Sequence, residues 1–288
     1  MTTESTVKDY FSLLKPRVMS LVIFTAITGL YLAPGTINPF IATIAILCIS
    51  IGSGAAGAIN MWYDRDIDNI MQRTKKRPIP SGRILPDDAL HFGIFLSILS
   101  VTLMGLAVNL TSAFLLAFTI FFYDYIYTVI LKRSTAQNIV IGGAAGALPP
   151  LIGWVAVTNQ ITIEPIILFL IIFLWTPPHF WALSLYSSDD YKKANIPMMP
   201  LVAGIASTKK QILVYTILLT FISILPFILN FCGYIYLFTS IILNIIFLIL
   251  TTKLLLDTQN KIAGKVFGFS IFYLFALFLS AIIDKFLN

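Results

Sequence analysis

Long apolar runs recur along the chain and are separated by short polar segments. Most runs are about 17–24 residues long, which is enough for a helix to cross about 30 Å of hydrocarbon. Lipid offers the backbone no hydrogen-bond partner, so helices that satisfy their own N–H and C=O groups are expected. The pattern predicts an all-α polytopic membrane protein with about nine transmembrane helices, at residues 16–32, 40–63, 89–108, 112–131, 139–157, 165–186, 211–229, 234–255 and 266–283.

Composition supports one integral-membrane domain over residues 1–288. The chain is 58% hydrophobic and 11% charged, with a mean hydropathy of +0.90, which excludes an ordinary soluble domain. The net charge of +6 would suit a nucleic-acid partner, but the basic residues lie in short loops, where membrane orientation accounts for them. No nucleic-acid partner is therefore expected.

Nearly all basic residues fall on one side of a nine-span arrangement. If the N-terminus is cytoplasmic, only Lys285 of the 19 Lys and Arg residues lies on the opposite side. Such a bias is what the positive-inside rule predicts. We expect a multi-pass protein of the cell inner (plasma) membrane, with its C-terminus outside.

Neither terminal processing nor cysteine chemistry is indicated. Residues 1–15 are polar and the first apolar run has no small-residue cleavage pattern, so no removable signal peptide is expected. Cys48 and Cys232 lie in apolar runs and match no ligand spacing, which favours a packing role.

The densest group of charges follows the second run, in the segment NMWYDRDIDNIMQRTKKRPIPSGRI at residues 60–84. If the helix continues past residue 63, Asn60, Asp64 and Asp68 share one face, because they are four residues apart. Asp66 would point about 200° away from Asp64, toward the Arg and Lys residues of its own loop.

These side chains have the chemistry of a metal and diphosphate site. Carboxylate and amide oxygens suit Mg²⁺, which also binds substrate phosphates. Arg73 and Arg77 follow within the same loop and could neutralise a leaving diphosphate. The alternative is that all of these are solvated loop charges, positive only for topological reasons.

The same segment resembles the first aspartate motif of the UbiA-type intramembrane prenyltransferases, Asn-x3-Asp-x3-Asp followed by Met-x-Arg-Thr-x2-Arg-Pro. Within that superfamily it is similar to the protohaem IX farnesyltransferases, or haem O synthases. The resemblance extends from Lys15 to about Pro200 and is weakest in the last third of the chain.

A second matching signature lies at the end of the fourth run, in YDYIYTVILKRSTAQN. It places Lys132 and Arg133 at the same membrane face as the aspartates, where they could contact phosphate oxygens; the alternative is a positive-inside anchor. Asp124 lies within the span, where an ionisable group is costly, and its role is left open. Gly142-x3-Gly146 in the next run is typical of close helix packing.

The sixth run carries WTPPHFWALSLYSSDDYKKANIPMMP, again similar to the family. Pro177 and Pro178 should kink this helix near His179. His179 is interpreted either as a haem contact or proton-transfer group, or as a structural imidazole. Asp190 is a fourth candidate metal ligand beside Asn60, Asp64 and Asp68, although Ala194 stands where the superfamily motif has a second Asp.

The resemblance implies a UbiA-like helical bundle around a central cavity open to lipid. It implies Mg²⁺-assisted loss of diphosphate from farnesyl diphosphate, attack by the 2-vinyl group of haem B, and hydration to haem O. The implied catalytic residues are Asn60, Asp64, Asp68 and His179. The implied partners are farnesyl diphosphate, haem B as substrate, membrane lipid, and haem A synthase or terminal-oxidase assembly factors.

Two other functions remain open from the sequence. A UbiA-type enzyme that prenylates an aromatic quinone precursor would share the first motif but has no evident need of the TPPHFW signature. A membrane transporter would also carry buried charge and broken helices.

The first prediction concerns topology. A reporter fused after Gly82 or Lys209 should read as cytoplasmic, and one fused after Asn159 as external, because the positive-inside rule places the basic loops in the cytoplasm. Reporter activity in intact cells measures this directly. An external reading at Gly82 would invert the arrangement of the charged loops.

Overall fold

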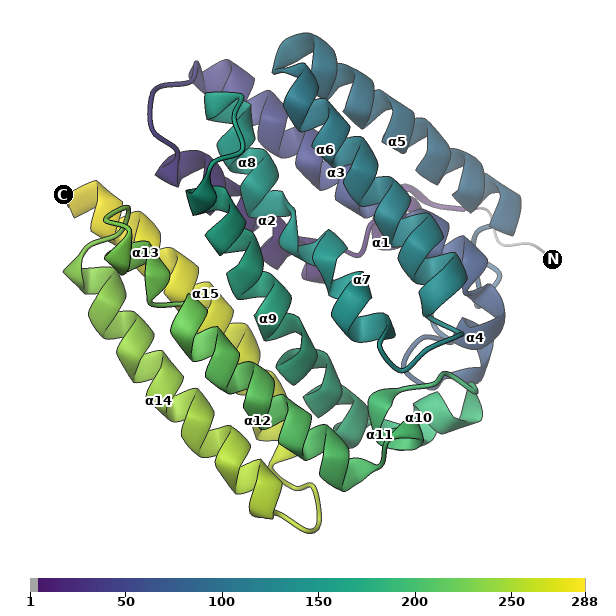
Figure 1. Ribbon diagram of the computed structural model, residues 1–288. Coiled ribbons are helices and arrows are strands. Elements are labelled where there is room, and N and C mark those ends of the chain that lie inside the picture. The colour runs from purple at the N-terminus through teal and green to yellow at the C-terminus, as the bar shows by residue number, and fades with distance from the viewer. Residues whose placement is uncertain (1–4, 288) are drawn as a thin grey trace.

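The computed structural model describes residues 5–287, apart from the side chains of Ser188 and Asp189. Within that range the chain is helical and contains no strand. The helices, shown in Figure 1, are α1 (Val7–Leu13), α2 (Pro16–Leu32), α3 (Pro39–Tyr63), α4 (Arg65–Ile70), α5 (Pro86–Ala107), α6 (Leu110–Phe121), the π-helix η1 (Phe122–Leu131), α7 (Asn138–Ala147), α8 (Pro149–Thr158), α9 (Ile163–Tyr186), α10 (Ser188–Lys193), α11 (Met199–Val202), α12 (Ile205–Ile222), α13 (Leu225–Ile228), α14 (Tyr234–Leu256) and α15 (Ala263–Leu287).

Eight helical segments in this range are long and apolar enough to cross a membrane. The pair α1 and α2, bent by 56°, passes the same test together and raises the number to nine. All nine predicted runs therefore coincide with helices. Three of these eight spans are made of consecutive segments: α6 with η1, α7 with α8, and α12 with α13.

Several boundaries follow from local sequence chemistry. Proline occupies the first turn of α2, α3, α5 and α8, where its missing N–H costs no hydrogen bond. Asn38 and Asn109 cap α3 and α6 through their side-chain oxygens. The seventh span begins at Ile205, six residues before its predicted start, because the helix includes Lys209, whose buried ammonium bonds the carbonyl of Asp257 at the end of α14.

Helix α9 runs through the middle of the bundle (Figure 1). It packs against α7 and α8 on one side and against α12 and α15 on the other. Helix α2 contacts both α8 and α15, so the first and last spans also lie together. Helix α9 continues through Pro177 and Pro178, and the kink expected there stays a prediction.

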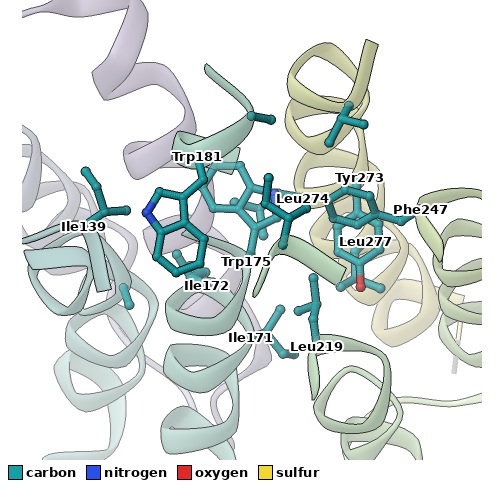
Figure 2. Packing of buried hydrophobic residues seen from close by; sticks show 14 of the residues in the cluster. Ile139, Ile171, Ile172, Trp175, Trp181, Leu219, Phe247, Tyr273, Leu274 and Leu277 are labelled. Carbon is teal, nitrogen blue, oxygen red and sulfur yellow. The ribbon is translucent and has the colours of Figure 1, made fainter. Parts of the chain in front are cut away.

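The largest core cluster surrounds α9 (Figure 2). Trp175 and Trp181 of α9 belong to this cluster together with Tyr273 of α15 and Phe247 of α14, and all four are buried. Because lipid is as apolar as these side chains, the cluster is held by packing and hydrogen bonds rather than by exclusion of water.

Because consecutive spans run in opposite directions, the loops that carry the cations lie at one end of the bundle. Lys15, Arg77 and Lys132 all bond residues between Asn60 and Asp68, at the end of α3. Lys285 instead donates to the carbonyl of Ala33, at the other end of the bundle. The structure thus reproduces the separation of basic residues on which the topology prediction depends.

Close packing depends on glycine at a few positions. A Cβ on Gly29 of α2 would lie 1.9 Å from the carbonyl oxygen of Pro150, and one on Gly153 of α8 would lie 2.2 Å from that of Ala26. A Cβ on Gly142 would lie 2.1 Å from a ring carbon of Tyr127, whereas a Cβ on Gly146 would meet nothing within 4 Å. Only the first glycine of the Gly142-x3-Gly146 pair therefore makes a close approach.

The second prediction concerns these glycines. Gly29→Ala and Gly153→Ala should each lower stability by about 1–3 kcal/mol or more, because the obstructing atoms are backbone and cannot rotate away. Thermal unfolding in detergent would measure the effect. Gly146→Ala is the matched control and should be neutral; equal losses at all three positions would contradict the close contact between α2 and α8.

Candidate active site

Three polar side chains are buried together at the end of α3. Asn60, Asp64 and Asp68 are 3%, 0% and 2% exposed. Helix α3 ends at Tyr63, but the backbone bonds from Asp64 to Asn60 (2.9 Å) and from Asp68 to Asp64 (2.8 Å) carry the helical register into α4. The Asn60 amide also donates to Asp64 Oδ2 at 2.8 Å. The predicted shared face is therefore confirmed.

The end of η1 supplies the cations that face Asp64. The ammonium of Lys132 bonds Asp64 Oδ2 directly, and Arg133 approaches Asp64 Oδ1 at 3.5 Å. Lys132 and Arg133 are thus at the aspartates, as the sequence predicted, but they contact the carboxylates themselves. A carboxylate this deeply buried needs such partners, since an unpaired buried charge costs several kcal/mol.

The π-helical geometry of η1 contributes to this arrangement. Backbone bonds here span five residues, as from Lys132 N to Tyr127 O at 2.8 Å, and the wider turn shifts the side chains relative to an α-helix. Thr128 donates to the carbonyl of Tyr123 and accepts from the Asn60 amide at 3.1 Å. The hydroxyl of Thr128 thereby fixes the orientation of Asn60.

The loop after α4 closes over Asp68. Arg77 donates to Asp68 Oδ2 at 2.7 Å, and the Thr74 hydroxyl donates to the Asp68 carbonyl at 3.1 Å. Of the two loop arginines proposed for diphosphate, Arg77 is therefore at the site. The side chain of Arg73 is exposed and forms no hydrogen bond or ion pair with the residues at 5–287, so its place in the site stays a prediction.

The second acidic segment lies against the first. The backbone N–H of Arg73 donates to Asp190 Oδ2 at 3.3 Å, which joins the loop after α3 to α10, four spans later. Asn138 also reaches the carbonyl of Pro197 at 3.4 Å. The structure therefore brings Asp190, the fourth candidate metal ligand, to the loop that follows Asp68.

Lys15 is a site residue that sequence reasoning missed. Its ammonium donates to Asn60 Oδ1 at 2.7 Å, and its stem passes Gly57, where a Cβ would lie 3.4 Å from Lys15 Cδ. Lys15 has a left-handed backbone (φ 51°) between α1 and α2, in an open recess that it lines with Ser12 and Pro16. Its position just before Pro16 was the available signal. Nothing in the sequence indicated the role of Thr128.

Asp66 points away from the buried face, as predicted, but its partner was predicted wrongly. The side chain is 61% exposed and forms two 2.8 Å bonds with Arg133, not with the cations of its own loop. These hydrogen bonds hold the pKa of Asp66 below its usual range. Arg133 also stacks over the Tyr63 ring at 5.0 Å, so Asp66 and Tyr63 both restrain it.

The donor set suits a hard divalent cation. Asp64 and Asp68 present carboxylate oxygens on one face; the amide nitrogen of Asn60 donates to Asp64, and its carbonyl oxygen accepts from Lys15. Ion pairs with Lys132, Arg77 and Arg133 balance the negative charge of these carboxylates. No group of three His, Cys, Asp or Glu side chains converges in the described part of the chain, so the four-residue ligand set that includes Asp190 stays a prediction.

His179 lies on α9, apart from the ion pairs. Its Nδ1 is 2.7 Å from the hydroxyl of Ser270 on α15. The ring stacks on Trp175 at 4.3 Å and on Phe267 at 4.7 Å. The imidazole is therefore held from two helices, and its catalytic role remains a prediction.

No role is assigned to Asp124, which lies within η1. Both carboxylate oxygens are buried without a hydrogen-bond partner among the residues described. It lies on η1 four residues before Thr128, in the same π-helix that delivers Lys132 to Asp64.

Comparisons with known proteins agree with this arrangement. Residues 22–280 match the UbiA prenyltransferase family. The protoheme IX farnesyltransferase of Rickettsia felis is 59% identical over 278 residues, covering 96% of this chain and 91% of that protein. The protein of the same name from Rhizobium rhizogenes is 56% identical and covers 98% and 90%.

Solved structures share the fold at low identity. One from work on digeranylgeranylglyceryl phosphate synthase in membranes superposes with a TM-score of 0.82 at 23% identity, covering 98% of this chain and 99% of that one. A UbiA homologue from Archaeoglobus fulgidus bound to GPP and Mg²⁺ gives 0.69 at 16% identity, covering 95% and 99%. The helical bundle predicted from the sequence is therefore confirmed.

Proposed function

Because the chain belongs to the UbiA prenyltransferase family, we propose that it transfers the farnesyl group of farnesyl diphosphate to the 2-vinyl group of haem B, with addition of water, to make haem O. The chain is a multi-pass membrane prenyltransferase. The proposal that haem B is the acceptor rests on one observation above all. Relatives that are 56–59% identical over nearly the whole chain carry the name protoheme IX farnesyltransferase.

The charged cluster at the end of α3 is the proposed diphosphate site. Arg77, Lys132 and Arg133 pair with the carboxylates of Asp64, Asp66 and Asp68, and Lys15 bonds Asn60, so several cations are gathered at one place. A diphosphate would be attracted electrostatically and would take over cations that now bond carboxylates. The ion pairs therefore hold the cations close to where phosphate oxygens would bind.

We assign Asp64, Asp68 and the Asn60 oxygen as the residues that would hold Mg²⁺, with Asp190 as a further candidate. The structure of the Archaeoglobus fulgidus homologue bound to GPP and Mg²⁺ supports this chemistry for the family. When bound, the metal neutralises charge that develops on the departing diphosphate. Lys132 and Arg77, released from the carboxylates, would donate to the same oxygens.

Aromatic and apolar side chains below the cluster suit a reactive allylic cation. The rings of Trp175, Phe180 and Phe267 gather around His179 within the membrane-spanning part of α9 and α15. Their faces can stabilise positive charge, and the apolar surroundings limit premature capture by water. The final addition of one water places a hydroxyl on the former vinyl group and releases one proton.

The proposed location is the cell inner membrane with the N-terminus in the cytoplasm. The charged cluster would then face the cytoplasm, where a soluble anionic donor is accessible. The porphyrin ring of haem B and the farnesyl chain, both apolar, would reach the site from the lipid side.

The third prediction tests the reaction. Purified protein in lipid, given farnesyl diphosphate, Mg²⁺ and haem B, should yield a haem whose mass equals haem B plus farnesyl and hydroxyl, and chelation of Mg²⁺ should abolish it. Extraction followed by chromatography and mass spectrometry measures the product. Prenylation of an aromatic quinone precursor without any new haem would contradict the proposed acceptor.

The fourth prediction compares three aspartates. Asp64→Asn and Asp68→Asn should each slow diphosphate release by on the order of 10²-fold, the scale of losing one preorganised electrostatic group, and should raise the Mg²⁺ concentration required. Asp66→Asn is the matched control, because its exposed ion pair contributes only about 0–1 kcal/mol. Release of diphosphate would be measured against Mg²⁺ concentration. Equal, metal-independent losses at all three positions would refute the shared metal face.

A further inference from the structure

The hydrogen bonds around Ser270 determine which nitrogen of His179 carries a proton. Ser270 is fully buried, and its hydroxyl donates to the carbonyl of Phe267 at 2.6 Å. A serine hydroxyl has one hydrogen, so while that hydrogen is given to Phe267 the oxygen accepts from Nδ1–H of His179, 2.7 Å away. This arrangement favours the tautomer with the proton on Nδ1, which leaves Nε2 with a free lone pair.

The imidazole is also fixed in orientation. Trp175 stacks on it at 4.3 Å with an interplanar angle of 18°, and Phe267 stacks at 4.7 Å with an angle of 30°. Trp175 is itself anchored, because its indole N–H donates to the Ser270 carbonyl at 2.7 Å. Ser270 thus holds His179 through its side chain and Trp175 through its backbone.

The other ring nitrogen of His179, Nε2, makes no such contact within residues 5–287. Within residues 5–287, Nε2 of His179 forms no hydrogen bond, and the residue remains partly exposed. A purely structural imidazole inside a membrane helix would be expected to satisfy both nitrogens, since lipid offers no partner. A ring that is fixed through Nδ1–H and free at Nε2 is instead the arrangement of histidines that bind metals.

We propose that His179 Nε2 binds the iron of the haem acceptor, and that Ser270 is the positioning residue that holds the imidazole in the required tautomer. This inference rests on the proposed function, because it takes haem as the acceptor. His179 lies seven residues before the end of α9, roughly 10 Å below that end at 1.5 Å per residue. The iron would thus be held within the membrane, below the charged cluster that binds the donor.

Haem titration tests the coordination without requiring turnover. Ferric haem B added to purified protein in lipid nanodiscs should give the absorption spectrum of an imidazole-ligated haem. His179→Gly should lose this spectrum, and free imidazole should restore it. Iron-free protoporphyrin IX should bind the wild type and His179→Gly alike, because it lacks the coordinating atom.

A serine pair tests the positioning role. Ser270→Ala should weaken haem binding roughly 10-fold or more, the scale of losing a partner that orients a metal-ligating histidine. Ser280 is the matched control: it lies on the same helix, is nearly as buried, and donates to the Leu277 carbonyl at 2.7 Å without touching a histidine. Ser280→Ala should leave haem affinity and spectrum unchanged. Equal losses in the two variants would overturn the role of Ser270.

Failure of this inference and failure of the proposed reaction give different results. If haem O forms but the wild-type spectrum lacks the imidazole signature, or persists in His179→Gly, the coordination is overturned and the reaction stands. If the spectrum depends on His179 but no farnesylated haem forms, the coordination stands and the proposed reaction fails.

Discussion

Asp64 is fully buried at the end of α3, and its charge must be balanced by other parts of the chain. Taking a carboxylate out of water costs several kcal/mol unless a cation and hydrogen bonds compensate. Lys132 and Arg133 come from the end of η1, and Asn60 comes from one turn earlier in α3. The pairing therefore joins two spans through Asp64 and Lys132, which are 68 residues apart in sequence.

The same requirement organises the neighbouring loops. Arg77 turns the loop after α4 back onto Asp68, and the backbone of Arg73 then lies against Asp190 on α10. Lys15 closes the other side through Asn60. Elements from both halves of the bundle thus converge on one charged cluster. His179 lies apart from it, stacked on Trp175 of the apolar core around α9. The spatial separation suits a reaction with one anionic and one apolar substrate.

The sequence predicted what depends on periodicity and composition. All nine spans, the shared face of Asn60, Asp64 and Asp68, and the outward direction of Asp66 follow from apolar length and helical spacing. Contacts between distant segments were harder to predict. The predicted partner of Asp66 was wrong, because its actual partner, Arg133, is 67 residues away in sequence. Lys15 was overlooked, because a single lysine before a span has the same pattern as an ordinary anchor. The π-helical turn of η1 leaves no periodic signature in ten residues.

The central claim is that the carboxylates at the end of α3 exchange their cationic partners for Mg²⁺ when diphosphate binds. A double-mutant cycle of Asp64→Asn and Lys132→Gln, followed by thermal unfolding, measures the energetic coupling of this pair. We expect strong coupling in the free protein and a loss of most of it in the presence of Mg²⁺ and pyrophosphate, because each side chain then binds a new partner. Coupling that is unchanged by Mg²⁺ and pyrophosphate would show that the ion pair is permanent, and would contradict the account.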